Sequence, residues 1–340
     1  MRGLSTLSLL LAVGCLALLT TAKASAQPAT ADAVRKTVAH SLPYLEQAGQ
    51  EWIDEKDCVS CHRISFMTWG FREAARQGLE VDQEKLKAWL DWSLAKSLAP
   101  SDDGEKLAGE NNTDGVTQLL LGHAPPGPAS LPAETATQLI GIVLKTQQDD
   151  GSWKPAGQLP FQKRPGEETR QVSTMWNLLA LRSGGNPAAV SADQLSAAEG
   201  RAIDWLAEPP LGQSTEWYAV RLLFAVQQDD ASATEAAIDQ LRTRQHEDGG
   251  WGWLTDDASD ALGTGQALYA LAQAGVPATD PMIADARQFL ISTQAGSGSW
   301  PVRGTKAKKQ ASVQETSTYW GTAWAAIGLL ATLPEPAASP

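Results

Sequence analysis

Gln245-His-Glu-Asp-Gly-Gly-Trp251 is a turn sequence that occurs in three copies in this chain of 340 residues. The other copies are Gln147-Gln-Asp-Asp-Gly-Ser-Trp153 and Gln294-Ala-Gly-Ser-Gly-Ser-Trp300. Each copy follows an amphipathic stretch, as at residues 140–146 and 286–292. The glycine breaks this first helix, and the tryptophan can cover the apolar underside of the turn. The pattern predicts a repeat of helical hairpins.

A second and more apolar helix follows each turn after a loop. The segments that align at this position are residues 67–74, 174–181, 215–222, 264–271 and 322–329, with a degenerate copy at 113–121. A helix that is apolar nearly all round is one that other helices enclose, whereas the first helices carry charge on one side. About six hairpins of this kind account for the length of the chain.

Alternation of inner apolar and outer amphipathic helices predicts an all-α fold, an (α/α)6 toroid of about six hairpin repeats. An open solenoid is the alternative, and it would leave the apolar inner layer facing water. The repeat predicts a single toroid domain over residues 27–333. The remaining residues, 334–340, are expected to form a disordered tail.

The Gln-x-x-Asp-Gly-Ser/Gly-Trp turns resemble the QW motifs of the squalene-hopene cyclase and protein prenyltransferase superfamily. The resemblance spans at least residues 133–332 and implies the same toroid. In that superfamily the QW turns are structural and tie the outer helices together. The resemblance therefore implies this role for Gln147, Trp153, Gln245, Trp251, Gln294 and Trp300.

The catalytic signatures of the superfamily are only partly present. Its cyclases protonate a polyene with an Asp-x-Asp-Asp cluster directly before the threonine of an inner helix, where crowding holds an acid neutral. Here Gly263 precedes that threonine, and the nearest acids, Asp256, Asp257 and Asp260, are the catalytic candidates that the resemblance offers. A helix-capping aspartate is the alternative interpretation. The cysteine that the prenyltransferase zinc site needs in a late repeat is missing from the sequence.

Toroids that cleave polysaccharides form a second class of enzyme with this architecture, and they use paired carboxylates or a general base in the cleft of the ring. Glu167, Glu168 and Glu315 stand in the long loops before inner helices, where a cleft residue is expected. Solvated loop charges are the ordinary alternative for such residues.

Cys58-Val-Ser-Cys61-His62 contains the only cysteines that follow the first 26 residues. Its spacing is that of a haem c attachment site, in which both thiols bond to the haem vinyl groups and the histidine ligates the iron. The sequence assigns no sixth iron ligand. A Cys58–Cys61 disulfide at the start of the first inner helix is the alternative. Zinc ranks behind both because no second pair of ligands follows at zinc spacing. Residues 47–52, just upstream, resemble a degenerate QW turn.

Aromatic residues recur on the inner helices. The residues predicted to line a central cavity are Trp69, Trp176, Trp217, Tyr269 and Trp324. Such a cavity suits a small apolar ligand, and the alternative is that these side chains only pack the inner layer.

The first 26 residues read as a secretory signal, with Arg2 before an apolar core and a small-residue cleavage site at residues 24–26. We therefore expect an exported protein, periplasmic or secreted. No later segment has the length of apolar sequence that a membrane span needs. The net charge of −12 argues against nucleic acid as a partner.

These patterns together favour an exported toroid that carries covalent haem c and acts in electron transfer, with a redox partner, or on a small ligand. The second hypothesis is a haem-free toroid that binds an apolar ligand or a protein and is clamped by the disulfide. The third is a haem-free enzyme, either a squalene cyclase-like isomerase or a polysaccharide-cleaving enzyme.

Overall fold

The computed structural model describes residues 29–59, 62–125, 127–156, 161–183, 190–207, 212–309 and 311–335. The predicted signal segment, Cys61 and residues 336–340 of the predicted tail lie outside these ranges. The secondary structure within them is helical, with isolated β-bridges between loops and no strand.

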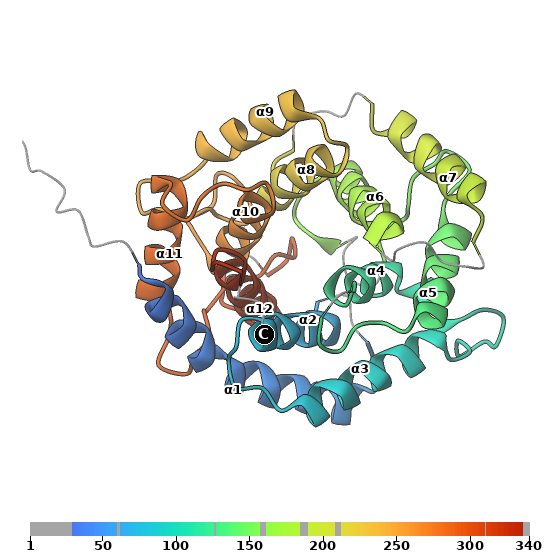
Figure 1. Cartoon of the computed structure of the whole chain (residues 1–340), viewed down its shortest axis with the longest axis horizontal. Helices are drawn as coiled ribbons and strands as arrows, with labels where there is room; N and C mark the ends of the chain where they lie inside the picture. Colours follow the sequence, from blue (N-terminus) through green and yellow to red (C-terminus); the bar gives the residue numbers. More distant parts are fainter. Residues whose placement is uncertain are drawn as a thin grey trace, which may run out of the picture.

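The helices form two concentric rings (Figure 1). The inner ring consists of α2 (Ile64–Arg76), α4 (Thr113–Gly122), α6 (Gly166–Ser183), α8 (Thr215–Gln227), α10 (Ala261–Gln273) and α12 (Glu315–Ala331). The outer ring consists of α1 (Ala31–Lys56), α3 (Gln83–Leu98), α5 (Ala133–Thr146), α7 (Ala192–Trp205), α9 (Ala231–Arg242) and α11 (Pro281–Thr293). Each predicted inner segment, the degenerate copy included, lies in an inner helix.

The ring is closed. Each inner helix packs against the next one along the chain, and α12 packs against α2. In the outer ring the last helix, α11, packs against the first, α1. The prediction of an all-α toroid is thus confirmed, and the open solenoid is wrong. Closure buries both sides of every inner helix, which explains why these helices are apolar nearly all round.

The QW turns link each hairpin to the next. The Gln245 side chain donates from Nε2 to its own turn, at the Gly249 carbonyl (2.8 Å), and to the Met282 carbonyl of α11 (2.9 Å). The Trp251 indole donates to the Leu241 carbonyl at the end of α9 (2.9 Å). The same bonds recur in the other two copies, through Gln147 and Trp153 and through Gln294 and Trp300. The turns therefore tie outer helices together, as the resemblance implies.

A glycine is required in each of these turns. Gly249 has a φ of 88°, and a Cβ atom there would come within 2.6 Å of the Asp285 carbonyl oxygen on the next outer helix. Gly298 has a φ of 82°, and a Cβ atom there would overlap the His40 carbonyl oxygen of α1. Both the left-handed backbone and the close approach of the neighbouring helix exclude a side chain.

Two expectations about local structure are wrong. Residues 47–52 form no turn, because they continue α1, which runs unbroken to Lys56. Glu167, Glu168 and Glu315 are not loop residues, because they occupy the first turns of α6 and α12. None of the described helices is long and apolar enough to cross a membrane.

Candidate functional site

The inner helices enclose a small central cavity, and part of its wall is aromatic. Trp324 is at the centre of this wall, with ring centroids 5.1 Å from Phe66, 5.7 Å from Trp69 and 5.9 Å from Trp176. Trp320, one turn earlier on α12, completes the aromatic side. The cavity volume is about 20 Å³, which is room for about one water molecule.

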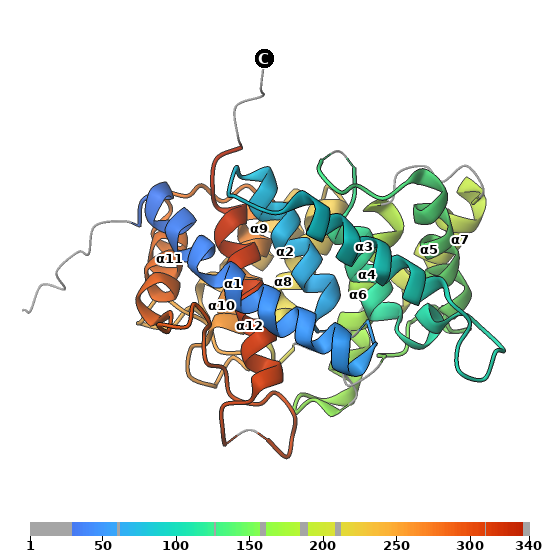
Figure 2. The same ribbon diagram turned by 90° about the horizontal axis from the view of Figure 1, so that it is seen from below.

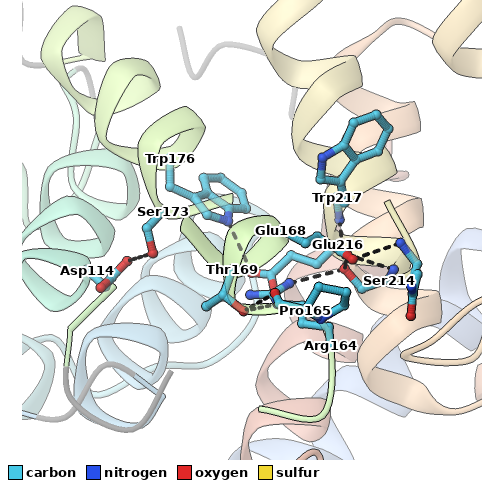
Figure 3. A network of polar contacts seen from close by, with 11 residues as sticks. Asp114, Arg164, Pro165, Glu168, Thr169, Ser173, Trp176, Ser214, Glu216 and Trp217 are labelled. Carbon is cyan, nitrogen blue, oxygen red and sulfur yellow. Dashed lines mark hydrogen bonds and ion pairs between the residues drawn. The ribbon is translucent and has the colours of Figure 1, made fainter. Parts of the chain in front are cut away.

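Most of the remaining lining of the cavity is polar. Arg164 and Glu216 line it as a buried ion pair, with 2.8 Å between Nη1 and Oε2. The Trp176 indole donates to the second Glu216 oxygen (3.1 Å), and Arg164 Nε donates to the Thr169 hydroxyl (3.1 Å). Figure 3 shows these side chains converging from the loop before α6, from α6 itself and from the first turn of α8. The charges are therefore held in one geometry by several bonds.

Glu168 holds the ion pair in place indirectly, through hydrogen bonds to the start of α8. Its carboxylate accepts hydrogen bonds from the backbone N–H of Gln213 (2.9 Å) and of Ser214 (2.8 Å), and from the Ser214 hydroxyl (2.5 Å). Ser214 is the N-cap residue of α8, and its hydroxyl also accepts a bond from Arg164. Glu168 thus fixes the start of the helix that carries Glu216.

Asp114 is the third charged group on the cavity wall, in the first turn of α4. Its carboxyl accepts bonds from the Ser173 hydroxyl (2.9 Å) and the Ala156 backbone N–H (2.8 Å). Burial raises the pKa of Asp114 to about 6, and the nearby Glu216 charge adds to this, whereas the two hydrogen bonds and Arg164 oppose it. Asp114 can therefore hold or release a proton close to neutral pH.

Three buried N–H donors beside the cavity have no hydrogen-bond partner. They are Nη2 of Arg164 and the indole Nε1 atoms of Trp320 and Trp324. All three side chains line the cavity. Buried donors are normally satisfied, so such a set favours a bound group with acceptor oxygens. Together with Asp114 and Glu216, the site can donate a proton and bind an oxygen-rich ligand.

The aspartates suggested by the resemblance lie elsewhere. Asp260 is the N-cap residue of α10, and its carboxylate accepts from the backbone N–H groups of Gly263 (2.8 Å) and Trp253 (2.9 Å). Burial raises its pKa to about 6. Asp257 forms an ion pair with Lys163. None of the three aspartates, Asp256, Asp257 or Asp260, lines the central cavity.

The three glutamates expected in the cleft do not meet at one site. Glu167 is exposed on the first turn of α6. Glu315 is largely exposed and pairs with Arg63, the N-cap residue of α2, at 2.5 Å. Of the predicted set, only Glu168 approaches the central site.

The described part of the Cys58–His62 motif lies at the entrance of α2, beside a cleft of about 820 Å³. The Cys58 side chain is exposed on this cleft, and Trp52 of α1 donates its indole N–H to the Cys58 carbonyl (2.8 Å). His62 lines the cleft from a buried position, and its ring meets Trp52 edge-on at 5.9 Å. Burial, with smaller effects of the Arg63 and Lys306 charges, lowers the pKa of His62 to about 3.

Cys61 lies outside the described residues, so both the predicted haem attachment and the alternative disulfide involve a residue that the structure does not place. Among the residues that line the cleft in the described part of the chain there is no methionine and no second histidine. Met67 and Met175 are instead fully buried in the core.

The aromatic residues predicted for the central cavity fall into two groups. Trp69, Trp176 and Trp324 line it. Trp217 instead donates to Gln171 (2.8 Å) and packs on Tyr218, whereas Tyr269 contacts Trp69 and Trp324 from behind.

Sequence reasoning missed Asp114, Arg164 and Glu216. Two of them carried a readable signal, because Asp114 and Glu216 each follow the first threonine of an otherwise apolar inner helix. A charge at that register needs a partner or a function, since an unpaired buried carboxylate is costly. Arg164 carried no such signal, because it lies in a loop.

Comparison with known sequences supports the resemblance to the cyclase superfamily over part of the chain. Residues 190–300 match the model of the squalene-hopene cyclase N-terminal domain. A curated relative, a probable squalene–hopene cyclase of Sinorhizobium fredii, is 35% identical over 103 residues. The match covers 30% of this chain and only 16% of that cyclase.

Comparison with solved structures shows the toroid over nearly the whole chain. The unsaturated glucuronyl hydrolase of Streptococcus agalactiae superposes with a TM-score of 0.55 at 10% identity, over 90% of this chain and 93% of that one. A possible member of the GH105 family from Salmonella enterica gives 0.53 at 14% identity, over 95% and 98%. The unsaturated glucuronyl hydrolase of Bacillus sp. GL1 gives 0.54 at 13%, over 89% and 96%. At these identities the similarity is one of fold.

Proposed function

We propose that this toroid is a carbohydrate-cleaving enzyme whose reaction takes place at the central cavity. The observation that carries the proposal is the buried Asp114, which shares one cavity wall with the Arg164–Glu216 pair. A carboxylic acid whose pKa is raised towards neutral pH, with a second carboxylate nearby, is the constellation that glycoside hydrolysis requires. The aromatic side chains of the same cavity suit the apolar faces of a sugar ring.

In this reaction the Asp114 carboxyl donates its proton to the glycosidic oxygen, and the bond from that oxygen to the anomeric carbon breaks. A water molecule supplies the new oxygen on carbon and gives its proton to Glu216. Arg164 and the Trp176 indole fix the orientation of Glu216. The cavity holds about one water, so a sugar ring can enter only when aromatic side chains of its lining move.

Two further points favour this assignment over a polyene cyclase. The solved toroids of similar fold include proteins named as glucuronyl hydrolases, whereas the cyclase match covers a small part of both chains. In addition, the carboxylate of Asp260 is engaged in capping α10 and lies off the central cavity. We also propose that residues 1–26 direct export of the enzyme, because export would bring it to extracellular polysaccharides.

The test is the release of reducing ends from a panel of neutral and acidic polysaccharides, with Asp114→Asn beside the wild type. We expect at least a 100-fold lower rate for Asp114→Asn, since a general acid contributes about 10²–10⁴-fold. The wild-type rate should fall as the pH rises above about 6. Asp91→Asn, an exposed aspartate on α3, is the matched control. A fully active Asp114→Asn variant, or a panel left intact by the wild type, refutes the proposal.

A second candidate function is favoured by the cleft beside Cys58. We propose that it holds a c-type haem, attached through Cys58 and Cys61 and ligated by His62. The volume of about 820 Å³ lies in the range of pockets that bind cofactors, and Trp52, Val59 and Pro100 make part of its lining apolar. Bound haem would supply one-electron chemistry. In that arrangement Trp52 would hold the His62 ring edge-on and keep the Cys58 backbone in place.

The test of the second candidate is a reduced-minus-oxidised visible spectrum of protein exported by a host that assembles c-type haem. We expect an α-band that survives denaturation and is lost in Cys58→Ala. Colourless protein with both thiols blocked would refute the haem and favour the disulfide-clamped, haem-free toroid.

A further inference from the structure

A second cavity, of about 110 Å³, adjoins the proposed active site. It shares the side chain of Trp320 with the central cavity and that of His62 with the cleft beside Cys58. Its other walls include Lys306 and Lys309 from the loop before α12, and Thr316 and Ser317 from the first turn of that helix. Figure 2 shows this loop extending from one side of the ring.

The loop that forms this cavity is basic in an acidic protein. Residues 301–314 contain Arg303, Lys306, Lys308 and Lys309 and no acid, whereas the whole chain has a net charge of −12. Neither Lys306 nor Lys309 forms an ion pair with any residue that the structure describes. A local positive field at the mouth of a cavity attracts anionic ligands and raises their rate of association.

The position of Lys306 is fixed by backbone pairing. The loop before α6 runs antiparallel to this segment, with a bridge between Gln162 and Lys306 and a bond from the Lys163 N–H to the Thr305 carbonyl (2.9 Å). The backbone of Lys306 is therefore held in place by this pairing at the wall of the cavity. A cation on a fixed backbone is suited to bind an anion in that cavity.

The start of α12 adds a second set of donors. This helix of 17 residues begins at Glu315, and Gln314 provides no side-chain cap, so the N–H groups of the first turn remain available. A helix N-terminus with free N–H groups favours a bound anion. The one carboxylate in this turn, Glu315, is paired with Arg63. The Trp320 side chain is 3% exposed, and its Nε1–H has no partner.

We infer that this second cavity binds the anionic group of an acidic sugar, a carboxylate or a sulfate, while the neighbouring glycosidic bond lies in the central cavity. Lys306 supplies the charge, and the Thr316 and Ser317 end of α12, with the Trp320 indole, supplies the directed hydrogen bonds. The inference rests on the proposed function and assigns the substrate class to it, namely polyanionic polysaccharides.

The experiment measures binding of oligogalacturonate, and of the same oligosaccharide as its methyl ester, to the full-length protein by calorimetry. We expect the acid to bind at least tenfold more tightly than the ester, and Lys306→Gln to remove this preference, since one charge-assisted bond accounts for about a tenfold difference. Lys308→Gln, on the same loop but outside the cavity lining, should retain the preference. A sulfated dextran measured beside unmodified dextran distinguishes a sulfate from a carboxylate ligand.

The inference and the proposed function can fail separately. The Asp114→Asn variant should bind oligogalacturonate like the wild type while cleaving nothing. Binding that discriminates between acid and ester without any cleavage would support the anion site and refute the proposed hydrolysis. The anion site would be overturned, even if neutral polysaccharides are cleaved, by equal affinity within both pairs, acid and ester as well as sulfated and unmodified dextran. A preference that is unchanged in Lys306→Gln would also overturn it.

Discussion

Substitution of Gln294 by alanine tests whether the QW turn holds the ring closed. The Gln294 amide donates to the Gly298 carbonyl of its own turn (2.9 Å) and to the Thr37 carbonyl of α1 (2.9 Å). The second bond joins the last outer helix to the first. Alanine at this position removes both donors and leaves two carbonyl oxygens without them.

The expected loss follows mainly from these two bonds, because the third contact of the amide, from Oε1 to His40 Nδ1 (3.2 Å), is exposed to solvent. A hydrogen bond contributes about 1 kcal/mol net, so Gln294→Ala should lower the free energy of unfolding by about 2 kcal/mol. Gln294 is the C-cap residue of α11 with extended backbone, so alanine gains no helix propensity that would offset this loss. Gln245→Ala, which breaks the equivalent pair of bonds, should cost about the same.

Urea denaturation followed by circular dichroism measures the effect. Gln148→Ala is the matched control, because the exposed Gln148 side chain bonds only to the nearby Thr146 carbonyl (3.1 Å) and should change stability by less than about 0.5 kcal/mol. If Gln294→Ala is as stable as this control, the QW glutamine does not stabilise the ring, and the structural role assigned to it is refuted.

Three further perturbations are expected to have defined effects. Gly298→Ala should cost at least about 1 kcal/mol more in urea denaturation than Gly275→Ala, because both have positive φ but only Gly298 lies against the backbone of α1. The folded state raises the pKa of Asp114 from 3.8 to about 6, so between these values it binds more protons than the unfolded state and stability falls as pH rises. Asp114→Asn should therefore gain about 2 kcal/mol relative to wild type between pH 4 and pH 7, and an equal difference at both pH values would contradict the pKa shift. Arg164→Ala should cost about 3–5 kcal/mol by leaving Glu216 buried without its cation, and a double-mutant cycle with Glu216→Gln should recover part of that loss.

The architecture could be predicted because its determinants are local. A QW turn needs a glycine with positive φ and a tryptophan that reaches back ten residues to its own helix, as Trp251 does to Leu241. Both requirements appear in a short sequence window. The apolar inner helices follow from burial on both sides. The prediction of a turn at residues 47–52 is wrong although their residue types resemble the motif, because they lack the glycine two residues before the tryptophan and the helix continues.

The candidate site could not be predicted in the same way, because it is assembled across repeats. Asp114 comes from α4, Arg164 from the loop before α6 and Glu216 from α8. The packing of these successive inner helices brings the three residues to one cavity. Glu168 was selected for a cleft, whereas it holds the start of α8 by three hydrogen bonds. A side chain's sequence position does not reveal whether it faces the ligand or supports the residue that does.

The bond from Gln294 to α1 also determines how disorder can spread through the molecule. In an open array of repeats, stability is a chain of nearest-neighbour terms, and the end units fray first because each has only one neighbour. Here α1 packs against α2, α11 and α12, so the first and last hairpins are neighbours of each other. The repeats behave as a one-dimensional lattice with periodic boundaries, in which no hairpin is an end unit and partial unfolding has to break two interfaces at once.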